Sequence, residues 1–98
     1  MPYVRVSIMR PMSGHEAEVE RLNRELLDFY RRCPGCLATY LLKAADSSGE
    51  VGRLTIWESE EDADRAANAD HSLALRSQLH LRIQPGHSDR SFQATPIL

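Results

Sequence analysis

The chain has 98 residues, enough for a single domain spanning residues 1–98. A formal net charge of −2, with acidic and basic residues intermixed, excludes the basic surface that nucleic-acid binding requires. No apolar run reaches the roughly 18 residues of a membrane span. The N-terminus also lacks the apolar core of a secretion signal. We therefore expect a cytoplasmic protein that binds neither membranes nor nucleic acids.

The N-terminal half has the pattern of a strand, a helix and a second strand. Residues 3–10 alternate with a period of two, which is typical of a β-strand. Ser13 precedes Glu16 by three residues, a capping-box pattern that predicts a helix start. The apolar stripe of this helix is Val19, Leu22, Leu26, Phe29 and Cys33. Pro34-Gly35 ends the helix, and residues 37–44, rich in Leu, Thr and Tyr, predict the second strand.

The C-terminal half predicts two more strands around a broken helical region. Turn residues 46–49 join the second strand to a third at 51–58, forming a hairpin. Ser59, with Asp62 three residues later, predicts the cap of the next helix. This helix breaks near residue 69, where Asp70 can cap a further segment, and residues 91–97 predict the last strand. The order βαββαβ predicts a ferredoxin-like α+β fold, an antiparallel sheet with its helices on one face.

The alternation along the strands divides their side chains between two faces of the sheet. We expect the helices to cover the aliphatic set: Val4, Val6, Ile8, Leu54, Ile56 and Phe92. The other face would then carry Tyr3, Arg5, Ser7, Met9, Arg53, Thr55 and Trp57. That face is too aromatic to stay solvated and too polar for a closed core. A second copy of the chain should therefore cover it and enclose a cavity, the alternative being a monomer with an open sheet face.

Several segments resemble the antibiotic biosynthesis monooxygenase (ABM) family. They are Arg32-Cys33-Pro34-Gly35-Cys36, Trp57-Glu58-Ser59-Glu60-Glu61, the Ala-rich helix that follows, and the step Asp70-His71. The resemblance covers nearly the whole chain. It implies a homodimeric α/β barrel in which two ferredoxin-like units face their sheets together. It also implies one of several activities: cofactor-independent oxygenation of phenolic polycyclic compounds to quinones, haem cleavage, or none known.

The haem-degrading branch of that family is not matched at its functional positions. There an Asn on the first strand, a Trp in the second helix and a His further along carry the chemistry. The corresponding positions here are Ser7, Ala66 and Arg76. Trp57 is not the counterpart of the catalytic Trp, because it lies earlier, at a strand end. The resemblance therefore does not extend to haem degradation.

The candidate substrate-binding residues are Trp57, Arg53, Arg5, Tyr40 and Ser7. An oxygenase without a cofactor must deprotonate a phenol, so that the substrate itself gives electrons to oxygen. It must also hold the resulting oxyanion in a dry pocket. Arg5 or Arg53 could hold the oxyanion, and Trp57 could stack on a flat ring. In the alternative interpretation the two arginines extend to solvent at the ends of the barrel or pair with glutamates across the dimer, and Trp57 is a packing residue.

His71 is the candidate general base, because it starts a helical segment just after the predicted break. The alternative is a surface or capping residue. The remaining histidines are scattered, and no pair has the i, i+4 spacing of a helical metal site. The C-x-x-C motif of Cys33 and Cys36 has no second copy, and Cys33 lies on the apolar stripe, which favours a structural role. We expect no metal and no cofactor.

Two functional hypotheses follow. In the first, the chain is a cofactor-independent monooxygenase acting on a phenolic or polycyclic aromatic small molecule in the barrel cavity. In the second, it is a non-catalytic homodimer whose cavity holds a small aromatic or apolar ligand. They differ in whether a His, Asp or Tyr lies within hydrogen-bond reach of the cavity.

Overall fold

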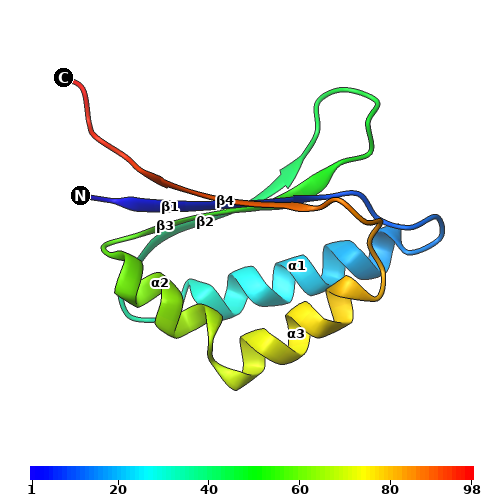
Figure 1. Cartoon of the computed structure of the whole chain (residues 1–98), viewed down its shortest axis with the longest axis horizontal. Helices are drawn as coiled ribbons and strands as arrows, with labels where there is room; N and C mark the ends of the chain where they lie inside the picture. The colour runs from blue at the N-terminus through cyan, green and yellow to red at the C-terminus, as the bar shows by residue number, and fades with distance from the viewer.

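The computed structural model describes all 98 residues as a four-stranded sheet with three helices. The elements are β1 (Tyr3–Met9), α1 (Glu16–Tyr30), β2 (Cys36–Lys43), β3 (Val51–Trp57), α2 (Glu60–Ala67), α3 (Asp70–His80) and β4 (Ser88–Gln93). The strand order is β2-β3-β1-β4, and all neighbours are antiparallel. All three helices lie on one side of the sheet (Figure 1), which confirms the ferredoxin-like α+β fold.

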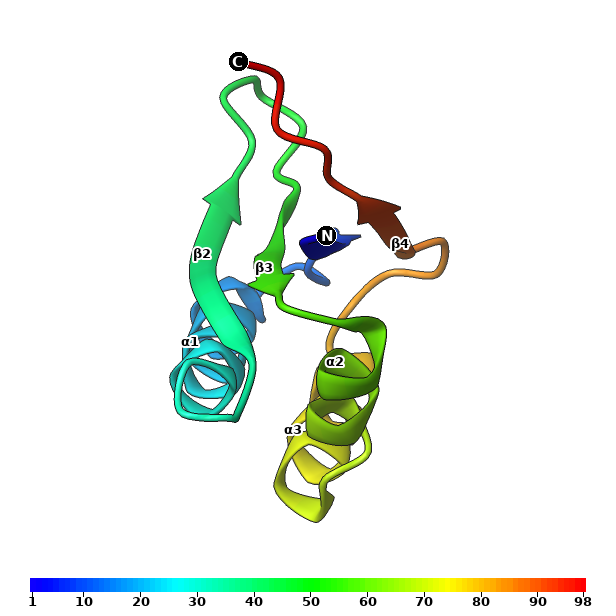
Figure 2. The same ribbon diagram turned by 90° about the vertical axis from the view of Figure 1, so that its left-hand side faces the viewer.

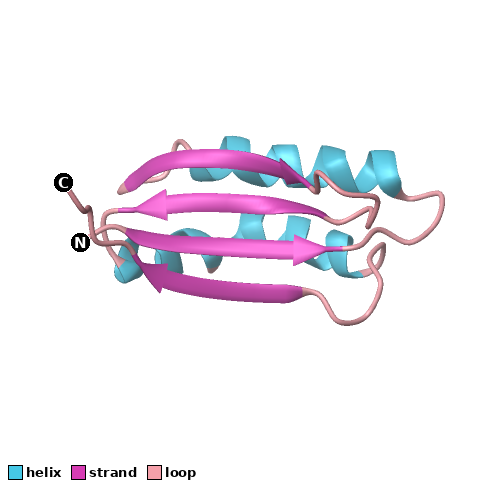
Figure 3. Cartoon of the chain, turned by 90° about the horizontal axis from the view of Figure 1, so that it is seen from above, coloured by secondary structure: helices cyan, strands magenta, loops and turns pink.

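The opposite face of the sheet has no covering layer. Seen from that side, the four strands lie in front of the helices, and both termini lie near the same end of the sheet (Figure 3). The aliphatic side chains Val4, Val6, Ile8, Leu54 and Ile56 are only partly buried. None of the three helices combines the length and the apolar composition that crossing a bilayer needs.

The predicted assignment of the two sheet faces is wrong. Tyr3, Met9 and Trp57 are buried beneath the helices, where they pack with Leu22 and Leu26 of α1. The aliphatic set lies on the open face instead. Alternation separates the strand residues into two sets, but it does not state which set meets the helices. The set that contains both aromatic and polar residues faces the helices. The helices pack on its aromatic residues, Tyr3 and Trp57, and leave a cavity beside its polar residues.

Helix starts agree only in part with the predicted caps. The Ser59 hydroxyl accepts a hydrogen bond from the Asp62 N–H at 3.2 Å, as predicted for α2. At α1 the predicted Ser13 cap is wrong: the N-cap is His15, which makes no side-chain cap bond. The predicted cap at Asp70 is also wrong, because Asp70 is already the first residue of α3. A carboxylate in the first turn still interacts favourably with the helix dipole.

The last strand begins earlier than predicted. β4 spans Ser88–Gln93 rather than 91–97, because its register is set by pairing with β1. Asp89 lies opposite Ser7, and Gln93 lies opposite Tyr3, the first residue of β1. Beyond Gln93 there is no strand left to pair with. This earlier start brings Asp89 onto the same face as the partly buried polar residues of β1, Arg5 and Ser7.

Candidate functional site

A cavity of about 320 Å³ lies between the inward face of the sheet and the helices. This volume is at the lower end of the range of small-ligand sites, roughly 300–1,000 Å³. Figure 2 shows α1 beneath β2, with α2 and then α3 beside α1 under the other part of the sheet. The lining comes from β1, β3, β4 and all three helices of one chain. The sequence analysis expected the cavity to lie between two subunits. That expectation is wrong, because the cavity is enclosed by the sheet and the helices of one chain.

Four of the five predicted binding residues line this cavity: Trp57, Arg53, Arg5 and Ser7. They come together because β1 and β3 are paired, with Ser7 opposite Arg53 and Arg5 opposite Thr55. Tyr40 does not join them. It lies opposite Leu54 on the open face and is 54% exposed.

His71 is not among the residues that line the cavity. Its ring packs against Phe29 of α1, with the ring centroids 5.1 Å apart. The contact explains its position at the start of α3 in terms of packing. His71 is therefore not placed to accept a proton from a substrate bound in this cavity.

Trp57 forms a fixed wall of the cavity. The indole is 1% exposed, and its Nε1–H donates to Thr55 Oγ1 at 2.8 Å. The Tyr30 ring meets it edge-on at 5.8 Å, and the Tyr30 hydroxyl is itself hydrogen-bonded to Ser72 Oγ at 2.7 Å. These contacts satisfy the polar atoms of both aromatic residues. The two rings therefore form a fixed, buried part of the cavity wall.

Arg53 is a buried cation without an anionic partner. It is 8% exposed and belongs to none of the ion pairs of the chain. One guanidinium nitrogen donates to Asn23 Oδ1 at 2.6 Å, and another donates to Ser7 Oγ at 3.3 Å. Burial lowers the pKa of Arg53, yet a guanidinium remains protonated in a protein. The cavity therefore holds a positive charge that no side chain neutralises by direct contact.

Asp89 is the only carboxylate that lines the cavity. Its Oδ1 accepts a hydrogen bond from Ser7 Oγ at 2.5 Å, and Ser7 Oγ in turn accepts from Arg53. Its other oxygen lies 3.5 Å from His87 Nε2. Ser7 thus bridges a cation and a carboxylate, so one site contains both a proton acceptor and a group that stabilises an anion.

Sequence reasoning missed both Asp89 and Asn23. The predicted last strand starts at Ser91 and leaves out Asp89, although Asp89 lies two residues earlier and so shares a face with Ser91. Asn23 had a clearer signal. It is four residues from both Val19 and Leu27, within the buried stripe of α1, and it is 0% exposed. A polar residue at such a position needs a buried partner.

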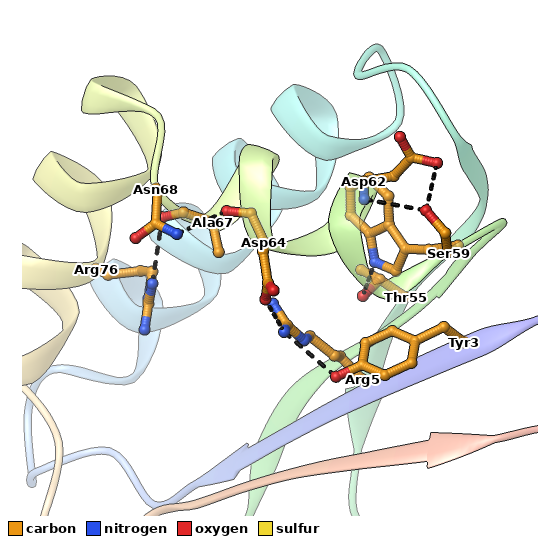
Figure 4. Close-up of polar contacts among 10 residues, drawn as sticks. Tyr3, Arg5, Thr55, Ser59, Asp62, Asp64, Ala67, Asn68 and Arg76 are labelled. Atoms are coloured by element: carbon orange, nitrogen blue, oxygen red, sulfur yellow. Dashed lines mark hydrogen bonds and ion pairs between the residues drawn. The ribbon is translucent and has the colours of Figure 1, made fainter.

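Arg5 is neutralised, in contrast to Arg53. Its guanidinium forms an ion pair with Asp64 of α2 and donates to the Tyr3 hydroxyl at 3.3 Å (Figure 4). Burial alone would lower the pKa of Arg5, but the bonds to Asp64 and Tyr3 outweigh it and raise the pKa. Arg5 therefore links β1 to α2 at the wall of the cavity. It is a weaker candidate than Arg53 for holding an oxyanion.

The C-x-x-C cysteines lie outside the cavity. Both are free and partly buried, and burial raises the pKa of each thiol. A raised pKa lowers the thiolate fraction and hence the reactivity. No group of three or more His, Cys, Asp and Glu side chains is placed to hold a metal ion.

The fold and the cavity together define a small α+β domain that encloses a ligand-sized polar site between its sheet and its helices. The family model described as "Antibiotic biosynthesis monooxygenase" matches residues 2–78, and the chain belongs to this family. No curated protein matches the chain.

Solved structures share the fold over nearly the full length. Rv0793 from Mycobacterium tuberculosis is 18% identical, with a TM-score of 0.89 over 99% of this chain and 98% of that one. SnoaB, a cofactor-independent oxygenase from Streptomyces nogalater, is 21% identical, with a TM-score of 0.83 over 99% and 96%. PA3566 from Pseudomonas aeruginosa is 20% identical, with a TM-score of 0.84 over 97% and 95%. At these identities the likeness shows a common fold.

Proposed function

We propose that the chain is a cofactor-independent monooxygenase that oxidises a phenolic or polycyclic aromatic compound in the cavity of each subunit. The observation that carries the proposal is the pairing of an unneutralised Arg53 with Asp89 across Ser7 at one cavity. Membership of the monooxygenase family supports it, as does the oxygenase activity in the name of SnoaB.

The proposed reaction uses the substrate as its own reductant. Asp89 accepts the phenolic proton, and the Arg53 guanidinium stabilises the phenolate that forms. The electron-rich anion transfers an electron to O₂, and the two radicals combine into a substrate peroxide. Loss of water leaves a carbonyl, so a CH₂ centre and O₂ become a C=O group and H₂O. All the electrons come from the substrate.

A direct test is incubation with a hydroxyanthrone in air while quinone absorbance is followed. We expect the protein to form quinone faster than buffer does. Asp89→Asn should slow the reaction about a hundredfold, because a positioned general base contributes at least that much. Asp46→Asn, in the exposed turn between β2 and β3, is the matched control and should keep the wild-type rate.

Two results would count against this proposal. If Asp89→Asn and Asp46→Asn react equally fast, Asp89 is not the base. If the wild type binds the hydroxyanthrone but forms no quinone above buffer, the chain is the non-catalytic ligand-binding protein of the second hypothesis. Ligand binding is followed independently by quenching of Trp57, the only tryptophan.

We further infer a homodimer in which a second copy covers the open face of the sheet. This face carries the aliphatic residues of β1 and β3, and Tyr40 and Phe92 at its sides are 54% and 43% exposed. Contiguous apolar surface of this kind marks interfaces, and a two-fold dimer is the commonest solution. The partner would then cover the aliphatic face and leave the cavity within each subunit.

Ile56→Asp should convert the dimer into a monomer. Ile56 lies on the inner strand β3, opposite Val4 and Ala38, so its side chain is on the open face between two neighbouring strands. Burying an unpaired carboxylate there is strongly unfavourable. Sedimentation equilibrium should give twice the chain mass for the wild type and 11.1 kDa for the variant. Leu81→Asp, at a residue 75% exposed after α3, is the control and should stay dimeric. A wild type of single-chain mass would refute the dimer.

A further inference from the structure

The turn between α1 and β2 carries a cysteine at its first position and another at its fourth. The Cys36 N–H donates to the Cys33 carbonyl oxygen at 3.3 Å, which closes a four-residue turn. Pro34 at the second position and Gly35, with φ +84°, at the third make it a type II turn. Such a turn brings its end Cα atoms within about 7 Å, and a disulfide spans Cα separations of about 4.4–6.8 Å. The backbone therefore places the two cysteines where a disulfide can join them.

Both thiols are free, partly exposed and bonded elsewhere. Cys33 Sγ donates to the Phe29 carbonyl at 3.4 Å, back along α1, and Cys36 Sγ donates to the Ala38 carbonyl at 3.8 Å, forward along β2. A thiol is a weak donor, so giving up these bonds costs little. Joining the two sulfurs requires rotation of both side chains about their Cα–Cβ bonds.

Contacts from other elements fix the shape of the turn. The Gly35 carbonyl oxygen accepts a hydrogen bond at 2.8 Å from the N–H of Glu58, the residue after β3. A Cβ at Gly35 would collide with the Asp62 side chain of α2, so the turn lies directly against that helix. The folded chain therefore holds the two cysteines in one arrangement, which the unfolded chain must find at a cost in entropy.

The two cysteines adjoin the aromatic wall of the cavity. The Cys33 N–H donates to the Tyr30 carbonyl at 2.9 Å, and Cys36 is the strand partner of Trp57. The rings of Tyr30 and Trp57 meet at 5.8 Å, and both line the cavity. The ladder between β2 and β3 is irregular here, since its register shifts between Cys36 and Ala38. A bond between the cysteines would tie the end of α1, which carries Tyr30, to the strand that pairs with Trp57.

We propose that Cys33 and Cys36 form a reversible dithiol–disulfide site, whose closure locks the wall of the cavity formed by Tyr30 and Trp57. The co-reactant is a low-molecular-weight disulfide, R–S–S–R. The thiolate of one cysteine attacks it, forms a mixed disulfide and releases RS⁻. The thiolate of the other cysteine then attacks the mixed disulfide and releases a second RS⁻. In total the two protein thiols lose two electrons and two protons and gain one S–S bond, while R–S–S–R becomes two RSH.

The surroundings of the thiols make this exchange slow. Burial raises the pKa of both thiols, and the proximity of Cys33 adds to the shift at Cys36, while the charge of Arg32 partly offsets it at Cys33. The thiolate fraction at neutral pH is therefore small, and the first attack is slow. The site responds to a sustained change in the ratio of thiol to disulfide and not to a brief one.

The test equilibrates the full chain with mixtures of reduced and oxidised glutathione at about pH 8, where more thiolate is present. Alkylation and mass spectrometry should then find a form that lacks two hydrogen atoms, takes up no alkyl group and reopens with dithiothreitol. Its equilibrium constant should be about tenfold larger for the folded chain than for the chain unfolded in guanidinium chloride, because the folded turn already holds the pair. Cys33→Ser and Cys36→Ser are the controls, and each should stop at the mixed disulfide with glutathione.

Hydrogen exchange measures the effect on the wall. The Trp57 indole N–H, bonded to Thr55, should exchange about tenfold more slowly in the closed form, because opening must now stretch the tether. The Ala44 N–H, bonded to the Glu50 carbonyl at the far end of the hairpin, is the internal control and should exchange at an unchanged rate.

Equal equilibrium constants for the folded and the unfolded chain would overturn the site, since the fold would then contribute nothing to it. A folded wild type that stops at the mixed disulfide, or that forms disulfides only between chains, would overturn it as well. Unchanged exchange at Trp57, or equal slowing at Ala44, would refute the locking of the wall. None of these measurements involves the oxidation of a phenol, so their outcome is independent of the proposed monooxygenase activity.

Discussion

An Arg53→Met variant should oxidise a hydroxyanthrone about 10²–10³-fold more slowly than the wild type, the usual effect of removing one group that stabilises an oxyanion. Arg53 is 8% exposed, so water does not replace its charge when the side chain is removed. It is also the cation bonded to Ser7, which in turn is bonded to Asp89. Its loss removes the stabilisation of the phenolate at the point where the proton leaves. Initial rates of quinone formation measure the effect.

The same variant should be at least as stable as the wild type. Methionine fills a similar volume without a charge, and removing an unneutralised buried ion relieves a desolvation cost of several kcal/mol. The opposing cost is Asn23 Oδ1, which loses its donor at about 1–3 kcal/mol. The free energy of unfolding should therefore stay constant or rise by roughly 1–2 kcal/mol. Adding Asn23→Leu removes the orphaned acceptor and should raise it further.

Denaturant unfolding and the activity assay on the same samples separate the two effects. Arg31→Met, at an exposed residue that pairs with Asp28, is the control and should change neither quantity appreciably. A fall in stability of several kcal/mol in Arg53→Met would mean that the guanidinium is fully compensated in the folded chain. It would then be a structural residue and not a site kept charged for function.

The sequence was sufficient for the order of the elements and for four of the thirteen residues that line the cavity. Period-two alternation placed Arg5 and Ser7 on one face of β1, and it placed Arg53 and Trp57 on one face of β3. Pairing two adjacent strands then brings these side chains together whichever face meets the helices. The candidate set was therefore largely independent of the wrong face assignment.

The remaining features depend on tertiary packing. The choice of inward face is decided by how α1, α2 and α3 pack against Trp57 and Tyr3, and no local pattern encodes it. Asp89 belongs to an exposed strand whose conformation comes from pairing with β1. His71 and Tyr40 have suitable chemistry, but one packs on Phe29 and the other lies on the open face. Residue type alone does not distinguish these positions from a cavity.

Strand β3 lies close to the backbone of β1 at Gly52, so Gly52→Ala should cause a large loss of stability. A Cβ at this residue would lie 1.9 Å from the carbonyl oxygen of Ser7 and 3.1 Å from Ile8 Cδ1. The first contact is with backbone, so β1 and β3 must move apart at the centre of the sheet. Overpacking of this severity costs about 3 kcal/mol or more. For a domain of this size, Tm should fall by roughly 15 °C.

Gly14→Ala is the informative comparison, because its cause of strain is different. Gly14 has φ +86° but nothing within 4 Å of an added Cβ, so only the backbone conformation is penalised, at about 1–2 kcal/mol. Equal shifts in Tm for the two variants would show that the contact at Ser7 relaxes at little cost. If Gly52→Ala lowers Tm more than Gly14→Ala does, the folded Gly52→Ala protein should also oxidise a hydroxyanthrone more slowly than the wild type. Moving the Ser7 backbone displaces the hydroxyl that joins Arg53 to Asp89.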